Sequence, residues 1–201
     1  MTGGAPESAR PWRATAGTDA TGVQSDGEKR AMKLVDWLKE NVTDDPRALA
    51  WFDEDGGDER IARAFRELLA GYQREPSKIL KTTRMLEQDE KPGLVEVTDI
   101  DYHSICAHHF LPFFGHVDLA YVPGDRILGL GKLPRLVDAY ARRFQIQEDL
   151  VREVAHAMMD HGHARWVRVR ARGQHLCMCS RGPSSTLSVT HTEFELGTRE
   201  E

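Results

Sequence analysis

The N-terminal third of the chain combines a polar start with two stripes of apolar residues at helical spacing. Residues 1–27 carry few apolar side chains, so they cannot bury enough surface to offset their ordering entropy, and we predict a flexible tail. After them, a polar break near residues 53–58 separates two stripes that predict amphipathic helices. The stripes are Ala31, Leu34, Val35 and Leu38, followed by Ile61, Phe65, Leu68 and Leu69. We predict that residues 28–75 form an N-terminal helical segment.

Beyond residue 75 apolar and polar residues alternate, which indicates strands. Val167 and Val169, for example, alternate with Arg168 and Arg170. The predicted strands lie near residues 94–101, 117–123, 127–130, 166–172 and 186–196. Helical spacing returns between them, from about residue 133 to 140 and from 147 to 161. This order predicts an α+β fold, with an antiparallel sheet and helices on one face, over a domain of residues 76–201.

Composition and net charge exclude several classes of protein. The 201 residues suffice for one domain with a sizeable core, and the formal net charge of −5 argues against a general nucleic-acid binder. No apolar stretch is long enough to cross a bilayer, and the N-terminus lacks the apolar core of a secretion signal. Three cysteines, an odd number, fit no regular disulfide framework. We expect a cytoplasmic protein with no membrane or nucleic-acid partner, whose thiols bind metal.

A cysteine and two histidines occur together at residues 106–109, which read Cys-Ala-His-His. Cys106 and His109 are three residues apart, so one tight turn can present both to a single ion. A second thiol would come from Cys177 or Cys179, which spacing alone does not distinguish. Two thiols and one imidazole leave the fourth position of a zinc ion open to water, as in a catalytic site. The alternative is that the thiols are small buried hydrophobes and the histidines are polar loop groups.

Further polar residues suggest recognition of a nucleotide. Lys132 and Arg135 lie three apart at a helix start, where exposed N–H groups and the positive end of the helix dipole favour phosphate. Arg181 could bind a phosphate through two parallel hydrogen bonds. Glu148, in the first turn of a helix, could accept hydrogen bonds from N1–H and the 2-amino group of guanine, a donor pair that adenine lacks. Taken alone, two basic residues at a helix start are usually just solvated, and a carboxylate in the first turn of a helix is normally a surface group that stabilises the helix dipole.

The residues before Arg181 suggest a histidine beside a possible metal thiolate. If the strand predicted at residues 166–172 continued through this segment, His175, Cys177 and Cys179 would face the same side of the sheet. His175 would then lie next to whichever cysteine binds the metal.

In this order along the chain, the motifs resemble the GTP cyclohydrolase I family. The similarity covers roughly residues 58–192. It runs through Asp-Glu-Arg-Ile-Ala-Arg-Ala-Phe at 58–65, Cys-Ala-His-His at 106–109, Pro-Phe-Phe-Gly at 112–115, Gly-Leu-Gly-Lys at 129–132, Gln-Ile-Gln-Glu at 145–148 and His-Leu-Cys-Met-Cys-Ser-Arg-Gly at 175–182. Several motifs in register are far more specific than any one of them.

The resemblance implies a role for each candidate residue, and it selects Cys177 over Cys179. The implied sets are the Zn²⁺ ligands Cys106, His109 and Cys177, the acid–base histidines His108 and His175, the guanine-binding carboxylate Glu148, and the triphosphate-binding cations Lys132, Arg135 and Arg181. The implied reaction opens the guanine imidazole ring of GTP, releases formate and forms 7,8-dihydroneopterin triphosphate. The implied architecture is the tunnelling fold, assembled into a ring-shaped homo-oligomer, a decamer of two facing pentamers.

Two positions depart from the family's pattern close to the expected site. Ala107 occupies the place of the usual glutamate, so His108 lacks one acidic partner. Gly131 replaces the usual serine before Lys132, which removes a hydroxyl donor to phosphate. These departures leave two alternatives open. One is a hydrolase that stops at the formamidopyrimidine or uses a different purine nucleotide, and the other is an inactive purine-binding homologue.

Overall fold

The computed structural model describes residues 26–42, 44–53, 56–87, 89–91 and 93–199, and the chain divides into two compact units between Glu59 and Arg60. Residues 1–25 of the predicted tail lie outside the described residues, and residues 26 and 27 already belong to the first helix. The predicted division of the chain at residues 75 and 76 stays a prediction.

The helices near the N-terminus follow the two predicted stripes, with one addition. They are α1 (Asp26–Asn41), α2 (Pro46–Asp53) and α3 (Gly57–Leu68). The first and last match the predicted helices, whereas α2 was not predicted. The sequence did carry a signal for α2, because an aspartate followed by proline is a common helix start. In the structure, Asp45 Oδ1 accepts a hydrogen bond from Arg47 N at 3.0 Å, and Pro46 occupies the first helical position.

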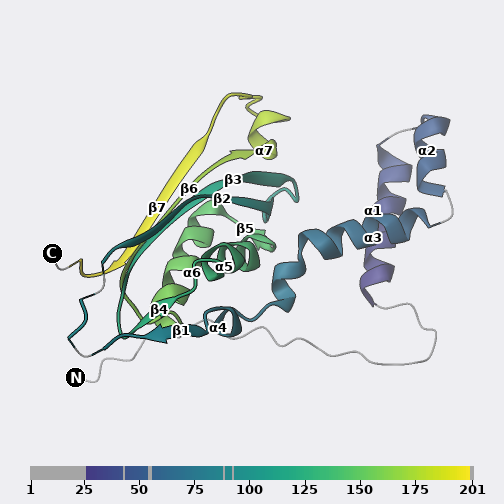
Figure 1. The fold of residues 1–201 in the computed structure, drawn as a ribbon. Helices are drawn as coiled ribbons and strands as arrows, with labels where there is room; N and C mark the ends of the chain where they lie inside the picture. Colours follow the sequence, from purple (N-terminus) through teal and green to yellow (C-terminus); the bar gives the residue numbers. More distant parts are fainter. Residues whose placement is uncertain (1–25, 43, 54–55, 88, 92, 200–201) are drawn as a thin grey trace, which may run out of the picture. The chain divides into compact units, whose positions relative to one another are not determined.

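A five-stranded sheet forms the centre of the second unit (Figure 1). In spatial order its strands are β5 (Phe144–Gln145), β2 (Val95–Cys106), β3 (Pro112–Pro123), β6 (Ala164–His175) and β7 (Thr190–Gly197). The strands from β2 to β7 pair antiparallel, as the alternation predicted. The expectation of a wholly antiparallel sheet was wrong, because β5 pairs parallel with β2. A strand of two residues is too short to leave an alternating pattern in the sequence.

Two helices, α5 (Lys132–Ala141) and α6 (Gln147–Asp160), pack on one face of this sheet (Figure 1). Their inward residues and the facing side of the strands form a single core. Its fully buried members include Val117, Leu119, Leu136, Val154 and Val169. Burying a side chain of this size contributes about 1.5–3 kcal/mol. The predicted α+β class is therefore confirmed, and no helix among the described residues is long and apolar enough to cross a membrane.

The opposite face of the sheet carries charged side chains. Arg168 Nη2 lies 3.3 Å from Glu96 Oε1, Arg170 Nη2 lies 3.9 Å from the same oxygen, and Arg172 pairs with Asp99. Such partly exposed ion pairs contribute only about 0–1 kcal/mol each. The alternation along β6 therefore separates the apolar core from a polar surface, and the core supplies most of the stability.

Three short elements lie between α3 and β2. They are η1 (Ala70–Gln73), α4 (Pro76–Ile79) and β1 (Thr82–Met85). β1 pairs antiparallel with β4 (Arg126–Leu128), which follows β3, and the two form a separate sheet. Gly71 N donates to Arg142 O at 2.9 Å, and a Cβ at Gly71 would collide with Ala139 O. Only glycine therefore allows η1 to approach the end of α5 this closely.

The segment after β6 differs from the sequence prediction. A strand was expected to carry His175, Cys177 and Cys179 to the same side, but β6 ends at His175 and α7 (Leu176–Cys179) forms one helical turn. Ser180 N closes this turn by donating to Leu176 O at 2.9 Å. The helical turn buries Cys177 and leaves Cys179 more exposed, so the two thiols do not share a face. The run Leu-Cys-Met at 176–178 interrupts the polar–apolar alternation that a half-buried strand requires.

Candidate metal centre and nucleotide site

Two of the three expected metal ligands lie where β2 turns into β3, with Cys106 as the last residue of β2 and His109 on the turn. Cys106 N donates to Leu111 O at 2.9 Å, and Phe110 N donates to Cys106 O at 2.9 Å. Phe110 has a φ of 56°, the left-handed conformation that closes so short a turn, and its ring centroid lies 4.8 Å from that of Phe144 in β5. The turn therefore brings Cys106 Sγ within 3.7 Å of His109 Nδ1.

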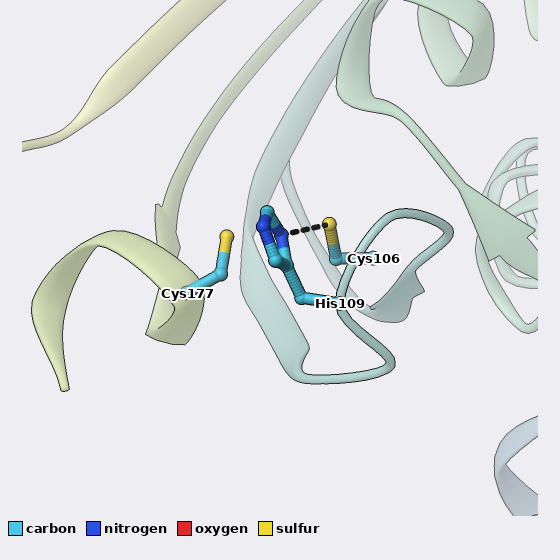
Figure 2. A group of neighbouring side chains, drawn as sticks. All are labelled: Cys106, His109 and Cys177. Atoms are coloured by element: carbon cyan, nitrogen blue, oxygen red, sulfur yellow. Dashed lines mark hydrogen bonds between the residues drawn. The ribbon is translucent and has the colours of Figure 1, made fainter. Parts of the chain in front are cut away.

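The third expected ligand, Cys177, reaches this turn from α7 (Figure 2). The two segments meet because β6, which leads into α7, pairs with β3, which follows the turn. The ligand atoms of Cys106, His109 and Cys177 all lie within 4.8 Å of one another. Both sulfurs belong to buried residues, whereas His109 is exposed. Cys179 is not part of this cluster, so the geometry agrees with the selection of Cys177.

The donor set and its electrostatics suit a metal ion. Burial raises the pKa of the Cys177 thiol, and the nearby Cys106 raises it further, because a second negative charge in a buried site is unfavourable. A divalent cation held by these residues would oppose both effects and favour the thiolates. The positive charge of Arg181, just after α7, acts in the same direction by lowering the pKa of Cys177. Thiolate and imidazole ligands are the usual ligands of zinc.

His175, the last residue of β6, is packed beside this cluster in a defined orientation. Its ring stacks on that of Phe113, with centroids 4.5 Å apart and planes 6° apart. Its Nε2 lies 2.9 Å from Gln147 Oε1. Burial lowers the pKa of His175, and the charge of Glu148 raises it by a smaller amount. The structure thus brings His175 and Glu148, two of the predicted site residues, within electrostatic reach of each other.

The sequence interpretation gave no role to Gln147, which the structure places at the centre of this region. Gln147 begins α6 and is only 1% exposed. It precedes Leu150, Val151 and Val154 by three, four and seven residues, so it lies on the buried stripe of the helix. A buried amide must be hydrogen-bonded, and a polar residue on an apolar stripe was the signal that could have identified it.

The remaining predicted residues lie at exposed or half-buried positions. Lys132 is the first residue of α5 and Arg135 follows one turn later. His108 is exposed on the turn, with its ring centroid 6.1 Å from that of His109. Within the described part of the chain, no hydrogen bond or ion pair links Lys132, Arg135 or His108 to the metal cluster. Their roles therefore stay predictions.

Comparison with known sequences decides the family. The profile of the family described as GTP cyclohydrolase I matches residues 38–201. The chain belongs to this family. "GTP cyclohydrolase 1" of Campylobacter lari is 42% identical over 133 residues, which cover 66% of this chain and 69% of that protein. The protein of the same name from Bifidobacterium longum is 46% identical over 135 residues, 66% of each chain, and that from Chlorobium phaeovibrioides is 41% identical over 139 residues, 69% of this chain and 61% of the relative.

The two departures of this GTP cyclohydrolase I family member have different structural settings. Ala107 lies exposed on the turn, where its N–H donates to Gln145 O at 3.0 Å. Gly131 precedes α5 with a φ of −65°, and a Cβ at this position would have no heavy atom within 4 Å. A larger residue would therefore fit at position 131 without strain, so glycine is not required there by the backbone.

We predict that replacing Cys177 removes the metal, whereas replacing Cys179 does not. Cys177→Ser takes one of three ligands from the cluster, and Cys179→Ser makes the same chemical change two residues away, outside the cluster. Elemental analysis of the purified proteins should show about one zinc per chain in the wild type and Cys179→Ser, and little in Cys177→Ser. Loss of zinc in Cys179→Ser with retention in Cys177→Ser would show that the ligand has been assigned to the wrong thiol.

Proposed function

We propose that the protein is a zinc-dependent GTP cyclohydrolase, which opens the guanine imidazole ring of GTP, releases formate and forms 7,8-dihydroneopterin triphosphate. The observation that carries this proposal is the convergence of Cys106, His109 and Cys177 in a chain of this family. Structural zinc sites close with four protein ligands, whereas three ligands leave a position for water. A protein that only bound purines would have no use for such an open position.

The residues around the metal divide the chemistry between them. When bound, zinc supplies Lewis-acid activation of water near neutral pH. His108, on the turn that carries two of the ligands, donates a proton to N7 as water attacks C8, because imidazole exchanges protons readily near neutral pH. Hydrolysis of the resulting formamide releases formate. His175 then donates a proton to the ribose ring oxygen, and the opened sugar rearranges and closes to the pterin.

Substrate recognition rests on charged residues at the starts of two helices and after α7. Glu148, in the first turn of α6, accepts hydrogen bonds from N1–H and the 2-amino group of guanine. Lys132 and Arg135, at the start of α5, and Arg181 bind the triphosphate, where the helix dipole of α5 adds to their charge. Because the reacting atoms lie at the other end of the nucleotide, these cations act mainly by positioning it.

We also propose that the chain adopts the tunnelling fold and assembles into a ring-shaped decamer of two facing pentamers, with active sites between subunits. Two features of the structure support assembly through the sheet. β7 pairs only with β6, which leaves its other edge without a partner among the described strands. The helix-free face of the sheet is charged rather than apolar, as a surface lining the inside of a ring would be.

One alternative function follows from Ala107. Without the acidic partner of His108, the enzyme would open the ring and stop at the formamidopyrimidine, or act on a different purine nucleotide. Incubation of the zinc-loaded protein with GTP separates these functions. Formate together with growing pterin fluorescence supports the cyclohydrolase, ring opening without fluorescence supports the alternative, and tight GTP binding with no turnover supports an inactive homologue.

We predict that Glu148→Gln lowers kcat/KM for GTP roughly 10- to 100-fold, the range expected when a hydrogen-bond pair to a charged group is lost. Asp149→Asn is the matched control, because it removes the same charge from the same helical turn and Asp149 pairs with Arg152 on the surface. Steady-state kinetics of pterin formation should show the loss only in Glu148→Gln. An equal loss in both variants would mean that the helix start, and not guanine recognition, is affected.

We predict that Ala107→Glu raises the rate of ring opening, because a carboxylate beside His108 would stabilise its protonated form and orient its ring. Ala107 is exposed, so the longer side chain has room. Single-turnover measurement of formamidopyrimidine formation isolates this step from later ones. A rate equal to or below that of the wild type would show that another carboxylate or water already serves His108.

We predict a decamer in solution, with a mass of about 227 kDa for ten chains of 22.7 kDa. Light scattering coupled to size-exclusion chromatography measures this mass, and the activity of each eluted fraction can be assayed with GTP. Activity should elute with the large species, because the sites lie between subunits. Full activity in a fraction of monomer mass would contradict the assembly.

A further inference from the structure

The side-chain amide of Gln147 has one possible orientation. Its Nε2 donates to Ala171 O at 3.2 Å, to Thr190 O at 3.1 Å and to Thr192 Oγ1 at 3.1 Å. Two of these partners are carbonyl oxygens, which only accept, so the amide nitrogen must face them. The amide oxygen therefore faces the opposite way, towards the end of β6.

The orientation of this amide determines which nitrogen of His175 carries a proton. Gln147 Oε1 lies 3.1 Å from the Tyr102 hydroxyl and 2.9 Å from His175 Nε2. An amide oxygen accepts and never donates, so both partners donate to it. His175 Nε2 therefore bears hydrogen, and its Nδ1 is the nitrogen left for chemistry.

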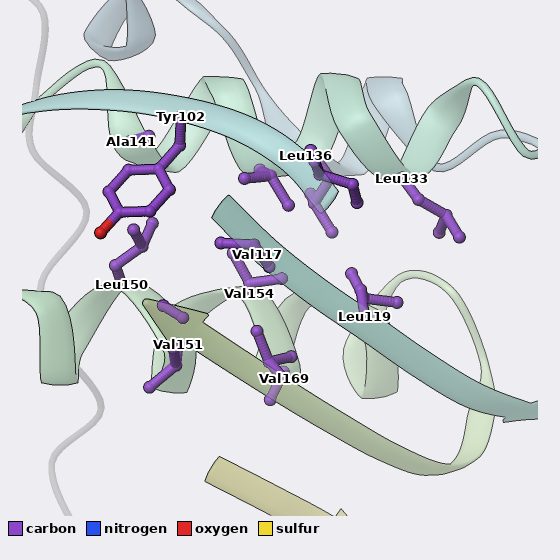
Figure 3. Close-up of a cluster of buried hydrophobic side chains, with 14 of the residues drawn as sticks. Tyr102, Val117, Leu119, Leu133, Leu136, Ala141, Leu150, Val151, Val154 and Val169 are labelled. Carbon is purple, nitrogen blue, oxygen red and sulfur yellow. The ribbon is translucent and has the colours of Figure 1, made fainter. Parts of the chain in front are cut away.

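Neighbouring side chains fix the plane of the His175 ring. Phe113 stacks on one of its faces, and Tyr102 meets the Phe113 ring edge-on, with centroids 5.9 Å apart and planes at 73°. Tyr102 reaches from β2 towards Leu150 on α6 within the core (Figure 3), where its hydroxyl remains bonded to Gln147. A Cβ at Gly173 would overlap the Tyr102 hydroxyl, so the glycine keeps this space open.

We propose that Gln147, supported by Tyr102, is a positioning residue that holds His175 with Nε2 protonated and thereby makes Nδ1 the nitrogen that exchanges a proton with the ribose of the substrate. This inference rests on the proposed function only for the identity of that step. No hydrogen bond among the described residues links Gln147 to the metal ligands, and its contribution, made through His175, concerns the stage after ring opening. Loss of the Gln147 side-chain amide should slow pterin formation and leave the opening of the imidazole ring unchanged.

The test compares the same substitution at two buried glutamines. Gln147→Met keeps the length of the side chain and removes the acceptor for His175. Gln145→Met makes the identical change at a residue that is 5% exposed and whose amide bonds Tyr140 O and Glu153, away from His175. With GTP as substrate, Gln147→Met should form pterin about 10- to 100-fold more slowly, the usual effect of losing an orienting partner. The deformylated ribosylaminopyrimidine, which precedes opening of the ribose, should accumulate, with formate release, zinc content and KM unchanged, while Gln145→Met should behave as the wild type.

Tyr102→Phe provides a graded second variant, because it removes one donor to Gln147 Oε1 and leaves the bond to His175 in place. Its rate of pterin formation should fall no more than about fivefold, the equivalent of one neutral hydrogen bond. Equal pterin rates in Gln147→Met and Gln145→Met would overturn the inference.

A direct measurement decides the protonated nitrogen without relying on catalysis. Solid-state ¹⁵N NMR of the full-length protein labelled at histidine, with the His175 signals identified by their loss in His175→Ala, should show hydrogen on Nε2. Hydrogen on Nδ1 instead would overturn the inference. If the wild type opened no GTP at all, the proposed function would fail, yet the NMR result would still decide the positioning of His175.

Discussion

The pairing of β3 with both β2 and β6 is the constraint on which the site depends. Its pairing with β2 creates the turn that presents Cys106 and His109, and its pairing with β6 delivers Cys177 to the same place. None of the three ligands depends on a long or mobile loop. The apolar core between the sheet and its helices keeps these strands in register, because a slip of one residue would exchange their buried and exposed faces.

A buried network of hydrogen bonds centred on Gln147 orients the residues next to the metal cluster. The amide of Gln147 joins α6 to β2, β6 and β7 through hydrogen bonds to Tyr102, His175, Ala171 and the segment 190–192. Both the nitrogen and the oxygen of the Gln147 amide have partners, which is the condition under which a buried polar group rigidifies a core instead of weakening it. The histidine beside the cluster is thus oriented by the same contacts that dock the helix on the sheet.

The elements with strong periodicity were predictable from the sequence, and those set by tertiary contacts were not. The alternation in β6 and the stripe of α6 indicated their type and approximate position. β5 is too short for any pattern, and α7 breaks the strand at an apolar run that reads equally well as strand or helix. Cys106 and His109 were candidates from spacing alone. The choice of Cys177 over Cys179 needed the family resemblance, because only the folded chain shows which thiol is buried against the turn. The position of Gln147 on an apolar stripe could have identified it as a buried amide, but its partners come from three separate strands, so no local pattern could show what it binds.

The distribution of ligands along the chain has a consequence for how the metal and the fold depend on each other. Before the strands have paired, the chain offers only the neighbouring ligands Cys106 and His109, and the third ligand arrives when the distant strand β6 has docked on β3. All three ligands therefore meet only in the folded chain. An ion that binds three ligands more tightly than two shifts the folding equilibrium towards the native state.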